Sequence, residues 1–148
     1  MILTDVNVLV HAHREDSPDH ARCLAEFEAL VSSSGAFGLS TLALSGFLRI
    51  VTHPRVFDPV SPLDQALAFC NYLRNQPHGI ALHPGARHWD IFQNLCREAN
   101  CKGNLIPDAW FAALAIEHGA EWVTMDRGFA RFPGLKWRMP MTAPEGSP

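Results

Sequence analysis

Short apolar runs alternate along this chain with longer segments whose apolar residues recur three or four positions apart. The short runs predict β-strands, and they lie at residues 2–4, 36–39, 79–83, 122–124 and 135–137. The longer segments predict α-helices that begin near residues 17, 40, 61, 85 and 107. Strands separated by helix-length segments favour an α/β fold, in which a parallel sheet has helices on both faces.

Several residues mark where these helices begin or end. Ser17 and Ser61 each precede a proline, a pattern typical of a helix N-cap followed by proline at the first helical position. Ser40 or Thr41 is a further candidate N-cap, and Pro107 predicts the start of a late helix. Gly119 predicts the end of that helix, because glycine readily adopts the left-handed conformation found after a helix C-terminus.

Three aspartates occupy positions where a parallel α/β sheet places its ligands. Asp5 follows the first predicted strand, Asp126 follows the run that ends at Thr124, and Asp108 lies in the first turn of the late helix. Ligands of such sheets bind beyond the carboxyl ends of the strands, so the three carboxylates meet there if the two strands are adjacent. Grouped carboxylates suit a hard divalent cation such as Mg²⁺ or Mn²⁺, which is a common centre of phosphodiester hydrolysis.

Each aspartate also has a purely structural interpretation. Asp5 is acceptable as a helix cap or a turn residue, and Asp108 is stabilised by the helix dipole in a first helical turn. Asp126 is a suitable cap for a short helix that starts at Arg127. Asn7 and Thr124 each lie two residues from one of the acids, where they are candidates for positioning a water molecule or a backbone group.

Composition and charge narrow the class of protein. The chain has 148 residues, 47% of them hydrophobic and 18% charged, which predicts one soluble domain. We expect that domain to span residues 1–139 and the proline-containing residues 140–148 to form a flexible tail. The sequence contains no apolar stretch long enough for a bilayer and no basic leader, so we expect a cytoplasmic protein without a membrane partner.

The formal net charge of −3 excludes a strongly basic nucleic-acid-binding domain. Contacts to a nucleic acid therefore have to come from local cations such as Arg49 and Arg127. The chain's eight histidines lack the helical i, i+4 spacing beside an acid that marks a hydrolytic zinc site, which disfavours that class of metalloenzyme.

Four segments, taken in order, resemble one family. They are Met-Ile-Leu-Thr-Asp-Val-Asn-Val-Leu-Val, Phe-Leu-Arg-Ile-Val-Thr-His-Pro-Arg-Val-Phe, Gly-Asn-Leu-Ile-Pro-Asp-Ala-Trp-Phe-Ala-Ala-Leu-Ala and Glu-Trp-Val-Thr-Met-Asp-Arg-Gly-Phe-Ala-Arg-Phe. The set is similar to PIN-domain ribonucleases, and above all to VapC-type toxins of type II toxin–antitoxin pairs. The resemblance implies a three-layer α/β/α fold with a central parallel sheet and a Mg²⁺- or Mn²⁺-dependent endoribonuclease. It also implies an RNA substrate, a small antitoxin partner and a homodimer.

The same resemblance assigns residues and reveals one departure. It places the catalytic, metal-binding acids at Asp5, Asp108 and Asp126, and it matches Thr124 to the family's Thr-x-Asp motif. The family usually has a glutamate three residues before the arginine of its second motif, where this chain has Gly46 and retains Arg49. Loss of this acid puts two-metal binding in doubt.

Two other functional classes stay open from the sequence. The first is a catalytically impaired PIN fold that only binds RNA or protein, for which Gly46 is the main support. The second is a phosphotransfer enzyme with Asp5 as its nucleophile. Such an enzyme usually has an acid two residues later, where this chain has Asn7.

Overall fold

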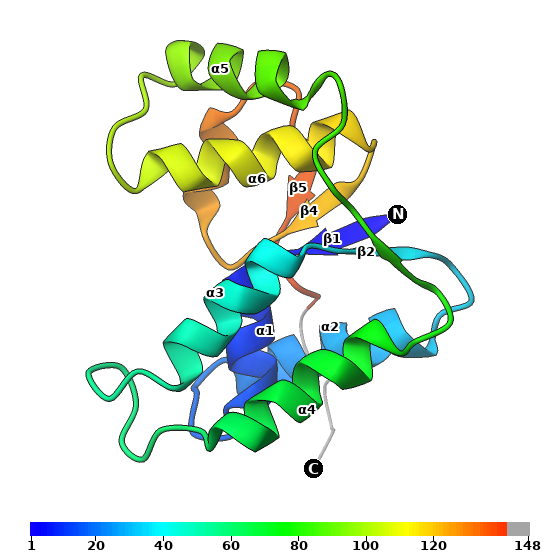
Figure 1. Ribbon diagram of the computed structural model, residues 1–148, viewed down its shortest axis with the longest axis vertical. Coiled ribbons are helices and arrows are strands. Elements are labelled where there is room, and N and C mark those ends of the chain that lie inside the picture. The colour runs from blue at the N-terminus through cyan, green and yellow to red at the C-terminus, as the bar shows by residue number, and fades with distance from the viewer. Residues whose placement is uncertain (142–148) are drawn as a thin grey trace.

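Five short strands, all parallel, form one sheet in the order β3-β2-β1-β4-β5 (Figure 1). The computed structural model describes residues 1–141. The strands are β1 Ile2–Thr4, β2 Phe37–Leu39, β3 Gly79–Ala81, β4 Glu121–Val123 and β5 Trp137–Arg138. The parallel sheet predicted from the alternation of strands and helices is therefore confirmed.

Helices cover both faces of this sheet. They are α1 Val6–His13, α2 His20–Ser32, α3 Thr41–Val51, α4 Leu63–Arg74, α5 His88–Glu98 and α6 Leu105–Glu117. Neighbouring residues of one strand point to opposite faces, so Val123 packs with α1 to α4 while Trp122 packs with α5 and α6. Figure 1 shows these two groups of helices with the strands between them. The result is the three-layer α/β/α fold.

Small residues let α6 pack closely against the sheet. Ala109, Ala112, Ala113 and Ala115 are fully buried in the core that this helix shares with β1 and β4. This close packing brings the first turn of α6, which contains Asp108, near the carboxyl ends of those strands. After the helix, Gly119 has a φ of 63°, as predicted for a glycine that ends a helix.

The sequence pattern did not predict helix α1. Asp5 is its N-cap, and its side chain accepts a hydrogen bond from the Val6 N–H group. The segment from Ile2 to Val10 is mostly apolar on both sides of Asp5, because β1 and much of α1 are buried in the core. This shared apolar character hides the change from strand to helix periodicity.

Two predicted N-caps were also wrong. Asp19 is the N-cap of α2 and Pro62 that of α4, so Ser17 lies two residues before its helix's N-cap and Ser61 one residue before. The Ser17 hydroxyl instead pairs with His11, and the Ser61 hydroxyl with His13 and Arg14. Both serines therefore tie a loop to the end of α1.

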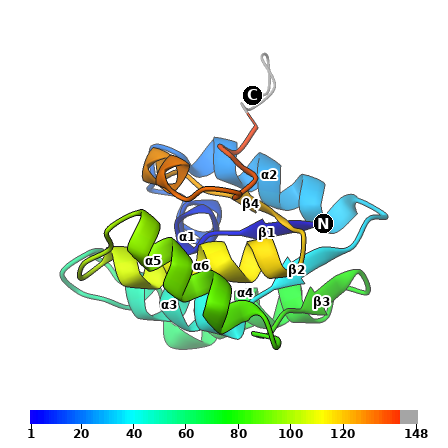
Figure 2. The same ribbon diagram turned by 90° about the horizontal axis from the view of Figure 1, so that it is seen from above.

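After β5 the chain lies against α2 (Figure 2). The Arg22 side chain donates a hydrogen bond to the Pro140 carbonyl at 2.9 Å, and the Met141 N–H group donates to Glu26 at 3.3 Å. Residues 142–148 of the predicted tail lie outside the described part of the chain. Within residues 1–141, no helix is both long and apolar enough to cross a membrane.

Candidate active site

Strands β1 and β4 are adjacent and aligned, as the predicted acid cluster requires. Thr4 pairs with Val123, and the Asp5 N–H group donates to the Val123 carbonyl at 2.8 Å. The residues that follow the two strands, Asp5 and Thr124, therefore lie side by side at the carboxyl edge of the sheet.

Thr124 links two of the three acids. Its side chain is fully buried, and its hydroxyl donates to Asp5 Oδ2 at 2.7 Å. Thr124 Oγ1 also accepts a hydrogen bond from the Asp126 N–H group at 3.0 Å. Thr124 thus fixes the Asp5 carboxylate and the backbone of Asp126 relative to each other.

Asn7 supports the same arrangement from helix α1. Its Oδ1 accepts a hydrogen bond from the Met125 N–H group at 3.1 Å, and its Nδ2 lies 3.3 Å from both Asp5 Oδ2 and Thr124 Oγ1. These contacts join the start of α1 to the loop after β4. Asn7 therefore helps to hold Asp5 and the loop after β4 in place.

The three predicted acids line one cavity. Asp5, Asp108 and Asp126 all face a hollow of about 350 Å³. Asp5 and Asp108 also border a second hollow of about 490 Å³, which includes Gly46 and Arg49 from α3. The two hollows therefore meet at the carboxylates.

Burial and neighbouring carboxylates raise the pKa values of Asp5 and Asp108 within this space. Asp5 is only 8% exposed, and its burial raises its pKa from 3.8 to about 6, although hydrogen bonds from Thr124 and Val6 oppose the rise. The nearby charges of Asp108 and Asp126 raise it further. Burial and Asp126 also raise the pKa of Asp108, while Arg131 counteracts them. The cavity therefore favours a bound cation.

The chemistry of these donors fits a hard divalent cation, since carboxylate oxygens are the ligands that Mg²⁺ and Mn²⁺ prefer. As the side chains stand, however, no three His, Cys, Asp or Glu groups of residues 1–141 lie close enough together to hold one ion. Both Asp5 oxygens accept protein hydrogen bonds, and Asp126 Oδ1 caps the Gly128 N–H group at 2.8 Å. Binding of an ion therefore requires carboxylates to reorient.

The two predicted arginines differ in position. Arg49 is exposed and borders the larger hollow beside Asp5 and Asp108. Arg127 is exposed at the start of the 3₁₀ helix Arg127–Arg131 and lines neither hollow. Arg131 acts on the pKa of Asp108 and is the nearer cation of this short helix.

Sequence reasoning missed part of the smaller hollow. His11, Val56, Phe57 and Phe129 also line it. His11 lies one helical turn after Asn7, so recognition of helix α1 would have placed both residues on one face. Val56 and Phe57 belong to the loop between α3 and α4. They end the second of the four segments that carry the family resemblance, but nothing in that segment predicted that they face the acids.

Comparison with known proteins gives relatives over nearly the whole chain. The family model described as PIN domain matches residues 2–135. The chain is 44% identical over 142 residues to the VapC ribonuclease Mb2897 of Mycobacterium bovis, covering 95% of this chain and 96% of that protein. It is 41% identical over 136 residues to ribonuclease VapC25 of Mycobacterium tuberculosis, covering 92% and 96%.

Solved structures share the fold at lower identity. VapBC2 from Rickettsia felis, bound to a promoter DNA fragment, aligns with a TM-score of 0.68 and 20% identity over 95% of this chain and 100% of that chain. Mycobacterium tuberculosis VapC20, a sarcin–ricin loop cleaving toxin, aligns with a TM-score of 0.64 and 14% identity over 92% and 99%. At these identities the likeness concerns the fold.

Proposed function

This chain belongs to the PIN-domain family, among the VapC-type endoribonuclease toxins. From that premise we propose that its catalytic site consists of Asp5, Asp108 and Asp126 and cuts RNA with the help of Mg²⁺ or Mn²⁺. The observation that carries the proposal is the meeting of these three acids in one cavity at the carboxyl edge of β1 and β4. PIN-domain VapC ribonucleases are metal-dependent as a class, which agrees with the uncompensated negative charge there.

Each residue has a distinct task in this scheme. The three carboxylates would hold the ion, which when bound neutralises charge on the scissile phosphate and activates water for attack. Thr124 and Asn7 keep Asp5 in place. Arg49, at the rim of the larger hollow, binds a neighbouring phosphate of the RNA. Arg127 contributes a more distant backbone contact.

Hydrolysis by water defines the products and therefore a test. Cleavage should leave a 5′-phosphate and a 3′-hydroxyl, whereas a 2′,3′-cyclic phosphate would show that the ribose hydroxyl attacked. Single-stranded RNAs and the sarcin–ricin loop, the named target of VapC20, are suitable first substrates.

We expect Asp108→Asn to abolish cleavage, because it removes one ionic ligand without changing side-chain size. The rate should fall by roughly 100-fold or more, the scale on which one catalytic electrostatic group contributes, and EDTA should have the same effect on the wild type. Trp89→Ala is the matched control, since Trp89 is 64% exposed and lines neither hollow. Cleavage by Asp108→Asn at the wild-type rate would contradict the assignment.

A PIN fold that binds RNA or protein without cutting is the alternative function. Gly46 favours it, because the acid usual at this position is missing from the larger hollow. A protein that binds RNA in Mn²⁺ but never cuts it would support this alternative. Phosphotransfer through Asp5 has less support, because Asn7 stands where such an enzyme usually has a second acid.

The same proposal includes partners and location. A small antitoxin should cover the acid cavity with a basic side chain, and the fold shared with VapBC2 supports such a partner. We also propose a homodimer that acts in the cytoplasm, where its RNA substrates are.

A further inference from the structure

The smaller hollow has an apolar side that the carboxylates do not explain. Three acids line one part of the hollow. The rest is largely a wall of aliphatic and aromatic side chains, namely Val10, Ile50, Val56, Phe57 and Phe129. A metal ion needs only the acids, and the RNA phosphates need that ion and cations such as Arg49. The apolar wall therefore suits a different part of the substrate.

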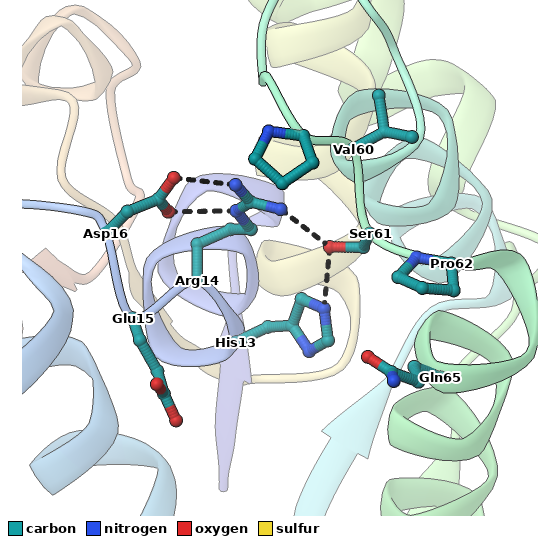
Figure 3. A pocket seen from close by; sticks show the side chains of 9 residues that line it. His13, Arg14, Glu15, Asp16, Val60, Ser61, Pro62 and Gln65 are labelled. Atoms are coloured by element: carbon teal, nitrogen blue, oxygen red, sulfur yellow. Dashed lines mark hydrogen bonds and ion pairs between the residues drawn. The ribbon is translucent and has the colours of Figure 1, made fainter.

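A partly buried ionic network, with Arg14 buried and Asp16 exposed, fixes the ring of Phe57 beside this hollow. The Arg14 guanidinium lies over that ring, with its central carbon 4.2 Å from the ring centroid. Asp16 accepts two hydrogen bonds from Arg14, at 2.9 and 2.6 Å (Figure 3). Ser61 accepts a third at 3.1 Å and lies 3.0 Å from His13 Nε2. The loop that contains Phe57 is thus attached to the end of α1.

His11 is fixed in a similar way. Its Nδ1 lies 2.6 Å from the Ser17 hydroxyl, and its carbonyl lies 2.9 Å from His20 Nδ1. With Nδ1 paired, Nε2 is the ring nitrogen available to a ligand in the hollow. The hollow therefore combines an oriented aromatic ring with an oriented polar group.

We propose that this hollow binds one unstacked base of the RNA next to the phosphate that is cut. Phe57 stacks on the base and His11 forms a hydrogen bond with its edge, as is usual where proteins recognise single-stranded RNA. Arg14 acts as a positioning residue for Phe57. This subsite rests on the proposed ribonuclease function and adds a source of base preference to it.

Continuity between the two hollows favours a nucleic acid over an apolar protein segment. Both are lined by Asp5, Val6, Ile50 and Asp108, so an RNA strand can pass from the arginine side to the aromatic side across the acids. Bases and phosphates alternate along such a strand. An acid centre flanked by a cation and an aromatic wall matches that alternation.

The test is an abasic scan of a short RNA whose cleavage site has been mapped. One base at a time is removed near the cut, and kcat/KM is measured for each RNA with the wild type in Mn²⁺. We expect kcat/KM to fall about ten-fold or more when the base at one position beside the cut is removed, because stacking of one base on an aromatic ring contributes about that much. Removal of a base at the other positions should change kcat/KM little.

Variants then assign that loss to the hollow. Phe57→Leu keeps apolar volume but lacks the ring, so it should cut intact RNA about ten-fold more slowly and cut the critical abasic RNA as the wild type does. Arg14→Gln should reduce the ratio of intact to abasic rates without changing the abasic rate. Trp89→Ala should keep the wild-type ratio, and thermal unfolding checks that each variant is folded.

The outcomes separate this inference from the proposed function. The base subsite would be overturned if folded Phe57→Leu kept the wild-type ratio of intact to abasic cleavage rates, or if the scan found no sensitive position. RNA cleavage would stand in either case, and the hollow would then suit an apolar side chain of a protein partner. No cleavage of any RNA by the wild type would overturn the proposed function and the subsite with it.

Discussion

Asp5 shows at the scale of single residues how burial prepares a carboxylate for a cation. Its pKa of about 6 means that the folded, metal-free protein binds a proton which the unfolded chain, with a pKa near 3.8, releases. Between those values the folded state holds more protons, so Asp5 makes the free energy of unfolding fall as pH rises. Above both pKa values the buried, ionised carboxylate lowers the free energy of unfolding, and a bound cation would reverse this effect.

We therefore predict that, in the metal-free protein, the stability of Asp5→Asn relative to the wild type rises from about pH 4 to pH 7 by up to roughly 3 kcal/mol. Urea unfolding in EDTA, run on the wild type and the variant at several pH values, measures this difference. Comparing the two proteins cancels the titration of the histidines. A difference that stays constant with pH would contradict the assigned environment of Asp5.

Residue types and their positions indicated much of this site in advance. Asp5 and Asp126 follow predicted strands, and Asp108 lies in the first turn of a predicted helix. Their meeting needed only the adjacency of β1 and β4, which the structure has. The contact between Phe57 and Arg14 was not predictable, although Phe57 ends one of the segments that carry the family resemblance, because it depends on how a loop between α3 and α4 folds against α1. Such contacts between distant segments leave no local pattern in the sequence.

Among the helices, α3 determines whether a further carboxylate reaches the larger hollow. Gly46 lies on it at the position where the family usually has glutamate. A β-carbon there would lie 3.2 Å from Val6 Cγ2, so only a small shift of that side chain is needed. The hollow of about 490 Å³ leaves room for the rest of a longer side chain.

Gly46→Glu should therefore bind Mn²⁺ more tightly than the wild type, by roughly ten-fold, because it adds an ionised ligand. Gly46→Gln is the control, with equal size and equal helix preference but no charge. Calorimetric titration with Mn²⁺ compares the three proteins. Equal affinities of the Glu and Gln variants would mean that α3 does not direct this side chain to the ion.

The molecule as a whole is held together in part by an ionic contact between the last strand, β5, and helix α2. Glu26 is 2% exposed and pairs with Arg138 at 2.6 Å, and Arg138 also pairs with Glu121 at 2.8 Å. The contact fastens the end of the sheet to one helical layer. Neither Glu26 nor Arg138 lines the two acid-bearing hollows.

Arg138→Met should lower the free energy of unfolding by about 3 kcal/mol, because it leaves the buried Glu26 charge without its partner. The double variant Glu26→Leu with Arg138→Met should recover most of that loss, since it removes both charges. Urea unfolding measures both changes, and RNA cleavage by the folded variants should stay near the wild-type rate. A double variant no more stable than Arg138→Met alone would refute the role given to this pair.

The most direct test of the catalytic centre is a crystal structure of the protein with Mn²⁺, read by anomalous diffraction. We predict an anomalous peak coordinated by Asp5, Asp108 and Asp126, with these side chains reoriented toward it. A Mn²⁺ ion bound elsewhere, or no peak among the three carboxylates at saturating Mn²⁺, would contradict the assignment of the metal site.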